Sequence, residues 1–287
     1  MSVVKRSKSE SGDSTLAFDD RKWGERMRYD TTALAVEDPR PGESGCDSGS
    51  LTMNPALRGP YHAIEGYLAA RAAGKLVLDY GSGHGIYSIQ PARIGAEVIG
   101  VDFSPRSSAL AVSRAARAGV ADRCRYVVGD CERLPFPSAM FDLVLSMGTM
   151  SSLRHDLAFA ELARVVKPDG EVLVTDTLGH NPLLNLNRWL LYRRGRRTRW
   201  ELDHIPTLRM LTQAREYFRE VRVEFFDLTT PLLAPFCRAD GAFSRRLTHL
   251  GQAVDRRLVR VKPLRRLAFK FVCTLSGPIV SPTRGTS

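Results

Sequence analysis

A glycine-rich run from Val77 to Gly85 is the part of this sequence most suggestive of chemistry. An aspartate at position 79 is followed by glycines at 81, 83 and 85, with apolar residues before the run and a helical pattern after it. This arrangement predicts a turn from a strand into a helix, where glycines let the backbone approach a ligand without Cβ contact. The helix start would also offer free N–H groups. We therefore predict that this turn surrounds a bound ligand, through Asp79, Gly81, Gly83 and Gly85.

The spacing of these glycines discriminates between two classes of nucleotide ligand. The dinucleotide fingerprint places its third glycine three residues after the second, but that position is Ile86 here and the glycine falls at 85. Asp79 would repel a pyrophosphate, whereas it suits a cationic group such as the ammonium or sulfonium of S-adenosylmethionine. The pattern therefore favours S-adenosylmethionine, and it disfavours the nearest rival enzyme, a nicotinamide-dependent dehydrogenase.

Three further polar residues stand where predicted strands end. Asp102 ends the second predicted strand and lies 21 positions after Gly81. An acidic residue at this place can accept both ribose hydroxyls of a nucleoside; the alternative is a surface residue that caps the helix beginning at Ser104. Asp130 follows the third predicted strand and Ser146 follows the fourth. Because parallel strands end at one edge of a sheet, these residues are expected close together.

The elements that must position these residues alternate regularly. Short apolar strands are predicted at 76–78, 97–101, 126–128, 141–145 and 171–175, and helices at 85–94, 104–119 and 156–166. Repeated strand–helix units predict a doubly wound α/β fold with a mostly parallel sheet and right-handed crossovers. Two later strands, at 221–226 and 269–275, would complete a sheet of seven strands.

The rest of the chain is expected to form an arm and two insertions. Residues 1–50 are rich in Ser, Gly, Asp and Glu, which predicts a largely flexible N-terminal arm. Large side chains between Trp23 and Tyr29 interrupt that composition and predict a segment that docks. The main domain would be 51–287, with helical insertions at about 179–206 and 229–267. We expect the arm and the first insertion to close over the carboxyl ends of the strands, covering the acceptor site and excluding water.

Taken in this order, the motifs resemble those of the class I, seven-stranded S-adenosylmethionine-dependent methyltransferases, in the broad UbiE-like group. The resemblance covers residues 75–176 and continues more loosely to 277. It implies that the glycine turn with Asp79 surrounds the methionine part of the cofactor and that Asp102 binds the ribose. It also implies that Phe103 packs against the adenine, that Asp130 binds the exocyclic amine of the adenine and that the Cys131 backbone faces the ring. Ser146 would lie near the methionine end of the cofactor.

The residues that act on the acceptor are less well specified by this resemblance. Many relatives carry a histidine where this chain has Ser152, and two glycines where it has Asp169–Gly170. Methyl transfer is an in-line displacement in which the protein mainly positions two reactants, but a hydroxyl acceptor also needs a base, usually histidine. We predict His180, after the fifth strand, or His204, at the end of the first insertion, as that base.

The net charge of +11 is concentrated in one part of the chain. Residues 188–270 hold 20 Lys and Arg against 8 Asp and Glu, whereas the remainder holds 22 against 23. This excess fits a solvated face, an anionic partner or a membrane surface. Arginines in the first insertion favour a small acceptor that is anionic or lipid-linked. The expected reaction is O-methylation of a natural-product, glycan or lipid-linked intermediate.

Two other functions are weighed against this one. A nucleic-acid methyltransferase would use the basic segment, but the Asn/Asp-Pro-Pro-aromatic motif is missing after the fourth strand, where 146–149 reads Ser-Met-Gly-Thr. We therefore expect no nucleic-acid partner. A binding module that has kept only the fold is the other reading, and the intact acids Asp79, Asp102 and Asp130 argue against it.

The composition bears on metal sites, disulfides, membrane spans and cellular location. The five cysteines are scattered, with no CxxC pair and no accompanying histidine cluster, so neither a metal site nor a disulfide framework is expected. No apolar run reaches the ~18 residues of a spanning helix, and the polar N-terminus lacks the apolar core of a signal peptide. The expected location is the cytoplasm, with peripheral contact to a membrane left open.

Overall fold

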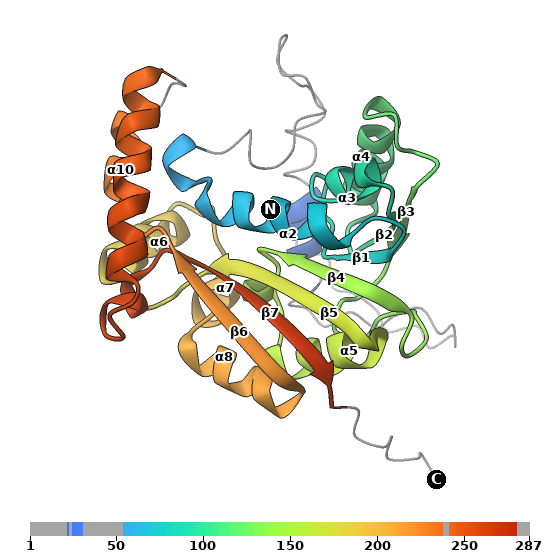
Figure 1. The fold of residues 1–287 in the computed structure, drawn as a ribbon. Helices are drawn as coiled ribbons and strands as arrows, with labels where there is room; N and C mark the ends of the chain where they lie inside the picture. The colour runs from blue at the N-terminus through green and yellow to red at the C-terminus, as the bar shows by residue number, and fades with distance from the viewer. Residues whose placement is uncertain (1–21, 23–24, 31–53, 238–240, 280–287) are drawn as a thin grey trace, which may run out of the picture.

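A seven-stranded sheet with helices on both faces forms the body of the protein (Figure 1). The computed structural model describes residues 22, 25–30, 54–237 and 241–279. The strands are β1 (Leu76–Tyr80), β2 (Glu97–Asp102), β3 (Cys124–Val128), β4 (Phe141–Met147), β5 (Val166–Thr177), β6 (Phe218–Phe226) and β7 (Lys270–Pro278). Their order is β3-β2-β1-β4-β5-β7-β6, and only β7 runs antiparallel to its neighbours. The predicted doubly wound, mostly parallel sheet is confirmed.

The register brings the carboxyl ends of the central strands to one edge of the sheet. Tyr80 at the end of β1 pairs with Val101 of β2 and with Ser146 of β4. Met147, which ends β4, pairs with Thr175 near the end of β5. The loops that follow β1, β2, β4 and β5 therefore share this edge, where open parallel sheets bind ligands.

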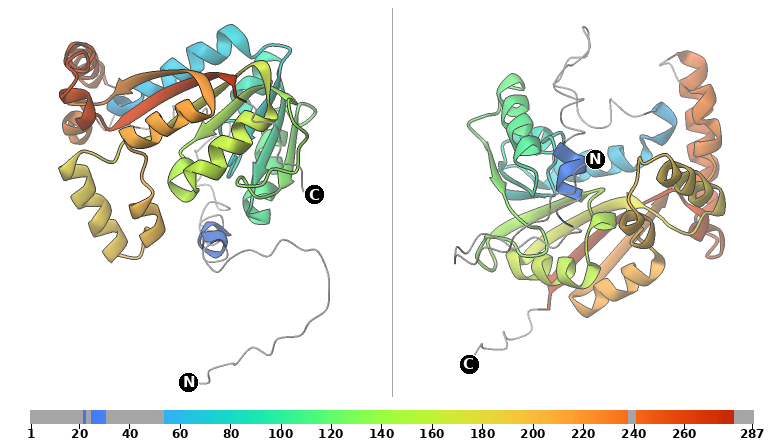
Figure 2. Two further views of the ribbon diagram at one scale, coloured as in Figure 1. Left: turned by 90° about the horizontal axis from the view of Figure 1, so that it is seen from below. Right: turned by 180° about the vertical axis from the view of Figure 1, so that it is seen from behind.

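Alternation along the strands divides the core into two layers. One layer joins Val77, Leu145 and neighbouring side chains to the helices α2 (Gly59–Arg71), α3 (Ile89–Ile94) and α4 (Pro105–Arg117). The other joins Leu78, Val144 and their neighbours to α5 (His155–Val165) and α8 (Leu208–Gln213). Figure 2 shows the two groups of helices on opposite faces of the sheet. Successive strand residues point to opposite faces, so short apolar runs can serve both layers.

The segments outside this core are helical and lie at the periphery. The first insertion contains α6 (Pro182–Arg193) and α7 (Arg199–Asp203). The second contains α9 (Thr230–Leu233) and α10 (Ala242–Leu258), joined through the 3₁₀ turn η4 (Ala234–Phe236). Residue 22 and residues 25–30 of the arm are helical, and the remainder of 1–50 lies outside the described residues. No helix in the described part of the chain is both long and apolar enough to cross a membrane.

One predicted helix is shorter than expected. The pattern predicted a helix over 85–94, but α3 begins only at Ile89. The preceding residues form a turn in which Gly81, Gly83 and Gly85 all have positive φ, a conformation that a right-handed helix excludes. The N–H groups of Gly81 and Ser82 donate to the Val101 carbonyl, so this longer turn is held in place at the sheet edge.

Candidate functional site

The turn after β1 packs so closely on its neighbours that two of its glycines have no substitute. Gly81 has φ +71°, and a Cβ there would lie 2.4 Å from Cγ2 of Thr149, in the loop after β4. Gly85 has φ +70°, and a Cβ there would lie 2.7 Å from the Cβ of Ala111 in α4. These contacts hold the turn against two elements at once and leave its backbone facing the cavity described below.

Asp79, near the end of β1, is hydrogen-bonded to Ser88, which follows the glycine turn. The side chain is buried and accepts a hydrogen bond from the Ser88 hydroxyl at 2.6 Å. Burial raises the pKa of Asp79 to about 7, since the Ser88 hydrogen bond opposes the effect only in part and the charge of Asp102 adds to it. The carboxylate therefore joins β1 to the start of α3.

Asp102, at the end of β2, ties the glycine turn to the next helix. Its Oδ2 accepts the Gly83 N–H at 2.9 Å, and its Oδ1 accepts the Ser104 N–H at 2.9 Å. Burial raises the pKa of Asp102, although both of these hydrogen bonds lower it. A carboxylate has about four lone-pair sites, so Asp102 can still accept further hydrogen bonds from a ligand. The neighbouring Phe103 ring packs edge-to-face on Tyr29 of the arm, with centroids 5.7 Å apart.

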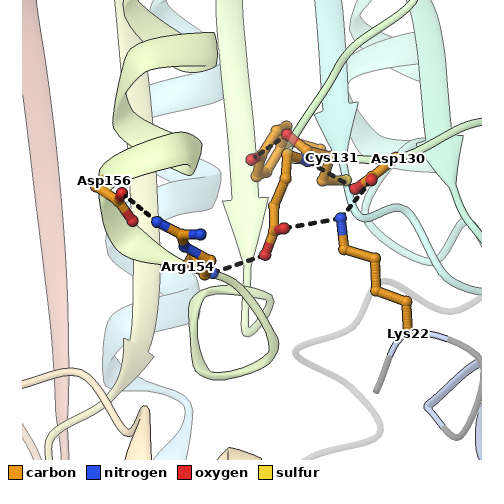
Figure 3. Close-up of polar contacts among 7 residues, drawn as sticks. Lys22, Asp130, Cys131, Arg154 and Asp156 are labelled. Atoms are coloured by element: carbon orange, nitrogen blue, oxygen red, sulfur yellow. Dashed lines mark hydrogen bonds and ion pairs between the residues drawn. The ribbon is translucent and has the colours of Figure 1, made fainter. Parts of the chain in front are cut away.

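The loop after β3 carries a cluster of acids that the arm reaches (Figure 3). Lys22 donates to Asp130 and forms an ion pair with Glu132 at 2.8 Å. Burial would lower the pKa of Lys22, but the two carboxylates outweigh it and raise that pKa. Glu132 also accepts the Arg154 N–H at 2.8 Å, and Tyr80 donates to the Cys131 carbonyl at 2.7 Å. The arm is thus anchored on the same loop that is expected to meet the adenine.

Two more contacts close the arm over the sheet edge. The Tyr29 hydroxyl lies 3.3 Å from Oγ of Ser152, after β4. Arg28 donates to Glu201, the buried residue of α7 in the first insertion. Figure 2 shows the arm helix and the insertion projecting at the same edge of the sheet. The structure therefore brings the arm and the insertion together above the strand ends, as the lid hypothesis expects; Trp23 lies outside the described residues.

A cavity of about 270 Å³ lies between the arm and the strand ends. Six of the nine residues predicted for the cofactor line it, namely Gly81, Gly83, Asp102, Phe103, Asp130 and Cys131. Asp79, Gly85 and Ser146 do not line it. Asp79 and Gly85 shape the turn, and Ser146 is buried within β4. Sequence reasoning assigned no role to several other lining residues, including Lys22, Tyr87, Glu132, Met147 and Thr149.

A second cavity of about 240 Å³ adjoins the first. The two share the lining residues Tyr29, Tyr87, Met147 and Gly148. Beyond these, the second cavity is lined by residues from α2, the turn after β4, β5, β7 and the first insertion, namely Tyr61, Ser151, Thr175, Asp176, Thr177, Arg197, Glu201 and Lys270. Its lining is more polar than that of the first cavity and includes charges of both signs.

Asp176 is the most unusual group in this second cavity. It is buried at the end of β5, and its Oδ1 accepts the Thr177 N–H at 2.6 Å. Its Oδ2 is buried and has no hydrogen-bond partner in the part of the chain that the structure describes. Burial raises the pKa of Asp176, while the backbone N–H groups of Thr177 and Ser151 and the charges of Lys270 and Arg188 act in the opposite direction. A buried carboxylate oxygen without a donor favours a ligand that supplies one.

Lys270, at the start of β7, brings a positive charge to the same cavity. It is buried, donates to the Tyr61 hydroxyl and lies 4.4 Å from the centre of that ring. The Tyr61 ring in turn stacks on Tyr87, with centroids 6.0 Å apart. Together with Arg197, Lys270 makes this end of the cavity suited to an anionic group.

The two histidines predicted as the base lie outside both cavities. His204 stacks on Trp200 with centroids 3.5 Å apart, and its Nδ1 lies 3.1 Å from the Trp200 carbonyl. The Nε2 of His180 accepts the Leu208 N–H at 3.0 Å, so this lone pair is already used. Neither imidazole therefore lines one of these cavities, because that of His204 contacts Trp200 within α7 and that of His180 contacts the backbone at the start of α8.

Comparison with known proteins agrees with this geometry. Residues 78–174 match the family model described as a methyltransferase domain. This segment contains β2 to β4 and most of β1 and β5, with all nine residues predicted for the cofactor. The chain thus contains a segment that is similar to a methyltransferase domain, within a seven-stranded, mostly parallel sheet.

Individual relatives differ in what they methylate. Sterol 4-C-methyltransferase strm-1 of Caenorhabditis elegans is 31% identical over 105 residues, which is 36% of this chain and 31% of that protein. A ubiquinone biosynthesis O-methyltransferase of Cereibacter sphaeroides is 35% identical over 109 residues, covering 38% of this chain and 43% of that protein. The chain thus matches less than half the length of either relative.

A solved structure shares the fold over most of the chain. The phosphoethanolamine N-methyltransferase 2 of Haemonchus contortus, in complex with phosphomonomethylethanolamine and S-adenosylhomocysteine, superposes with a TM-score of 0.57 at 20% identity. The match covers 91% of this chain and 60% of that one. At this identity the likeness concerns the fold alone. The named relatives methylate carbon, oxygen and nitrogen, so the atom methylated by this chain does not follow from them.

Proposed function

We propose that this protein transfers a methyl group from S-adenosylmethionine to a small acceptor bound in the second cavity. The observation that supports this best is the adjoining pair of cavities at the strand ends. One is lined by six residues of the cofactor motifs, and the other carries the buried, unpartnered Oδ2 of Asp176. Within the methyltransferases, the order of the motifs favours the UbiE-like group.

The residues of the first cavity fit the cofactor in size and charge. Asp102 has lone pairs left for the ribose hydroxyls, and Asp130 and Phe103 offer a hydrogen-bond acceptor and an aromatic edge for the adenine. The close approach of Gly81 to Thr149 leaves backbone rather than side chain facing the ligand. When bound, S-adenosylmethionine supplies an activated methyl group, and its sulfur keeps the bonding electron pair as the methyl carbon moves to the acceptor.

The protein's own task is to hold the acceptor and take its proton. An acceptor hydroxyl that donates to Oδ2 of Asp176 would satisfy the unpartnered oxygen and point its own oxygen into the space shared by the cavities. As the new C–O bond forms, the hydroxyl proton passes to that carboxylate. Burial raises the pKa of Asp176, which makes it a stronger base than an exposed aspartate. This role replaces the one first assigned to His180 or His204.

The acceptor proposed here is a natural-product, glycan or lipid-linked intermediate that carries a hydroxyl and an anionic group. Lys270 and Arg197 line the same cavity as Asp176 and would bind a phosphate or carboxylate on it. The arm and the first insertion would close over the acceptor, since Arg28 of the arm already pairs with Glu201 of the insertion. Closure would exclude water from the reacting groups.

Cofactor binding followed by methyl transfer is the direct test. Calorimetry should show that the protein binds S-adenosylmethionine and does not bind NAD⁺. A radiolabelled methyl donor with a panel of hydroxylated phosphates, glycans and quinone precursors should then label an acceptor. Binding of NAD⁺ alone would support a dehydrogenase, whereas cofactor binding without labelling in any panel would support a binding module. Labelling of RNA or DNA, with steep salt dependence, would support a nucleic-acid methyltransferase.

A further inference from the structure

The helix α10 faces the body of the protein with its polar side. Its buried residues recur at helical spacing and are small or polar, namely Ser244, Thr248, Gly251 and Asp255. A helix at the surface of a globular protein ordinarily turns its apolar side inward. The reverse arrangement in α10 requires a cause, and the contacts of the inward residues supply one.

The inward face of α10 is fixed by a buried carboxylate. Asp255 accepts hydrogen bonds from the N–H groups of Leu228 and Thr229, at 3.0 and 2.8 Å, and from the Thr229 and Thr230 hydroxyls, at 2.6 and 3.0 Å. A Cβ at Gly251 would lie 2.6 Å from Cδ1 of Leu233, so α9 packs directly on this position. Rotating α10 to hide its apolar side would break this network and bury an unsatisfied charge.

The outward face of α10 is therefore a stripe of large apolar side chains. Phe243, Leu247, Leu250 and Val254 follow one another at spacings of four, three and four residues along the helix. Phe243 is 71% exposed and Leu250 is 64% exposed. Two further exposed apolar residues belong to α9 and η4, which lie next to α10, namely Leu232 (66%) and Phe236 (69%). We call these six residues the α9–α10 surface.

Positive charge lies beside the α9–α10 surface along α10. Between 241 and 262 the chain carries exposed cations at Arg245, Arg246, Arg256, Arg257, Arg260 and Lys262. The one acidic residue in that range is Asp255, which is buried and faces inward. An apolar stripe beside a face rich in arginine is the composition of helices that lie in the interface of an anionic membrane. It fits neither a solvated helix, which exposes few large apolar side chains, nor a nucleic-acid contact, which needs no such stripe.

We propose that the α9–α10 surface docks on the surface of a membrane that contains anionic lipids. The apolar stripe enters the boundary between headgroups and acyl chains, and the flanking arginines contact lipid phosphates. A second copy of this chain is a poorer partner, because α10 packed on itself would bring arginines against arginines, and the acidic residue of α10, Asp255, is buried and cannot pair with them. The helix has 17 residues and does not cross the membrane.

The position of α10 leaves it accessible for such docking. It lies at the outer edge of the molecule beyond the β6–β7 side of the sheet, in Figure 1 and again in the view from behind in Figure 2. The residues that line the two cavities are not part of this surface. The proposal is therefore independent of the chemistry proposed for the site, and each can fail without the other.

Vesicle sedimentation with the full-length chain tests this proposal. Vesicles of phosphatidylcholine alone are compared with vesicles in which phosphatidylglycerol replaces part of the lipid. We expect binding to the anionic vesicles that weakens as salt is added. The double variant Phe243→Glu with Leu250→Glu should bind at least about tenfold more weakly, since both apolar anchors are lost and two like charges face the lipid. Arg256→Gln with Arg257→Gln should also weaken binding, by roughly tenfold or more.

The matched control is Val112→Glu in α4, because Val112 is also exposed (54%) but belongs to another part of the surface. This variant should bind vesicles like the wild type. Unchanged circular dichroism and S-adenosylmethionine affinity would show that each variant is folded. Absence of wild-type binding to anionic vesicles, or equal binding by the Phe243→Glu/Leu250→Glu variant, would overturn the proposal. A dimer in gel filtration that this variant converts to a monomer would assign the surface to a second copy instead.

Discussion

Replacing Asp176 by asparagine should separate activity from stability. Asparagine keeps the size of the side chain and can still accept the Thr177 N–H, which lies 2.6 Å from Oδ1. It removes the charge and the proton-accepting capacity of the buried Oδ2. General base catalysis contributes ~10²–10⁴-fold in rate, so turnover of Asp176→Asn should fall by that factor while cofactor affinity stays near that of the wild type.

The same substitution should not destabilise the protein at neutral pH. A buried polar group without a partner costs about 1–3 kcal/mol, and more when it is charged, so removing the charge relieves a cost already present in the wild type. Because folding raises the pKa of Asp176, folding favours its protonated form. That contribution is fully present below the unfolded pKa of ~3.9 and is lost as the pH rises through the folded value. The stability of Asp176→Asn relative to wild type should therefore increase with pH.

Two measurements, made over a range of pH, test these expectations. Chemical denaturation gives the free energy of unfolding at several pH values, and methyl transfer gives turnover over the same range. Wild-type turnover should decline as the pH falls through the raised pKa of Asp176, and the variant should lack this acidic limb. The control is Asp203→Asn, the same chemical change on an exposed residue of α7 that pairs with Arg199. Full turnover in Asp176→Asn would refute the base assignment, and a large loss of stability would refute the account of its burial.

The remaining predictions concern the cofactor cavity and the two histidines. Asp102→Ala should weaken S-adenosylmethionine binding by roughly ten- to hundredfold in calorimetry, because a hydrogen bond to a charged group contributes about 1.5–3 kcal/mol; an unchanged affinity would exclude the ribose role. Gly81→Ala should lower the melting temperature and abolish cofactor binding, since the new Cβ would meet Thr149 at 2.4 Å with φ at +71°; wild-type behaviour would show that the turn can relax. His180→Ala and His204→Ala should each keep turnover within about threefold, and a loss of ~10²-fold in either would restore the histidine base.

The sequence predicted the sheet because its signals are local. Short apolar runs in the sequence predict strands such as 76–80 and 141–147. A serine cap followed by proline in the first turn predicts helices such as 105–117. Motif spacing was equally informative, since strand ends converge on one edge in any parallel sheet. Six of the nine residues predicted for the cofactor accordingly line one cavity.

The orientation of individual side chains depends on contacts in the folded protein that residue spacing in the sequence does not predict. Asp79 was expected to face the ligand, but its partner is Ser88 beneath the turn. His204 was expected near the acceptor, but it stacks on Trp200, four residues earlier in the chain. In both cases the neighbour that decides the orientation is set by packing, and burial makes an unsatisfied alternative costly.

What the sequence by itself determined is the order of strands and helices, the glycine turn and the acids at the strand ends, since each follows from residue type and local period. Only the tertiary structure brought Lys22 of the arm to Asp130, 108 residues away, and Lys270 to the same cavity as Asp176. Only it showed that α10 leaves its large apolar side chains exposed, because the Asp255 network turns a different, polar face inward. The spacing of apolar and polar residues along a helix predicts that its faces differ in character. The hydrogen-bond partners of the buried residues determine which face points inward.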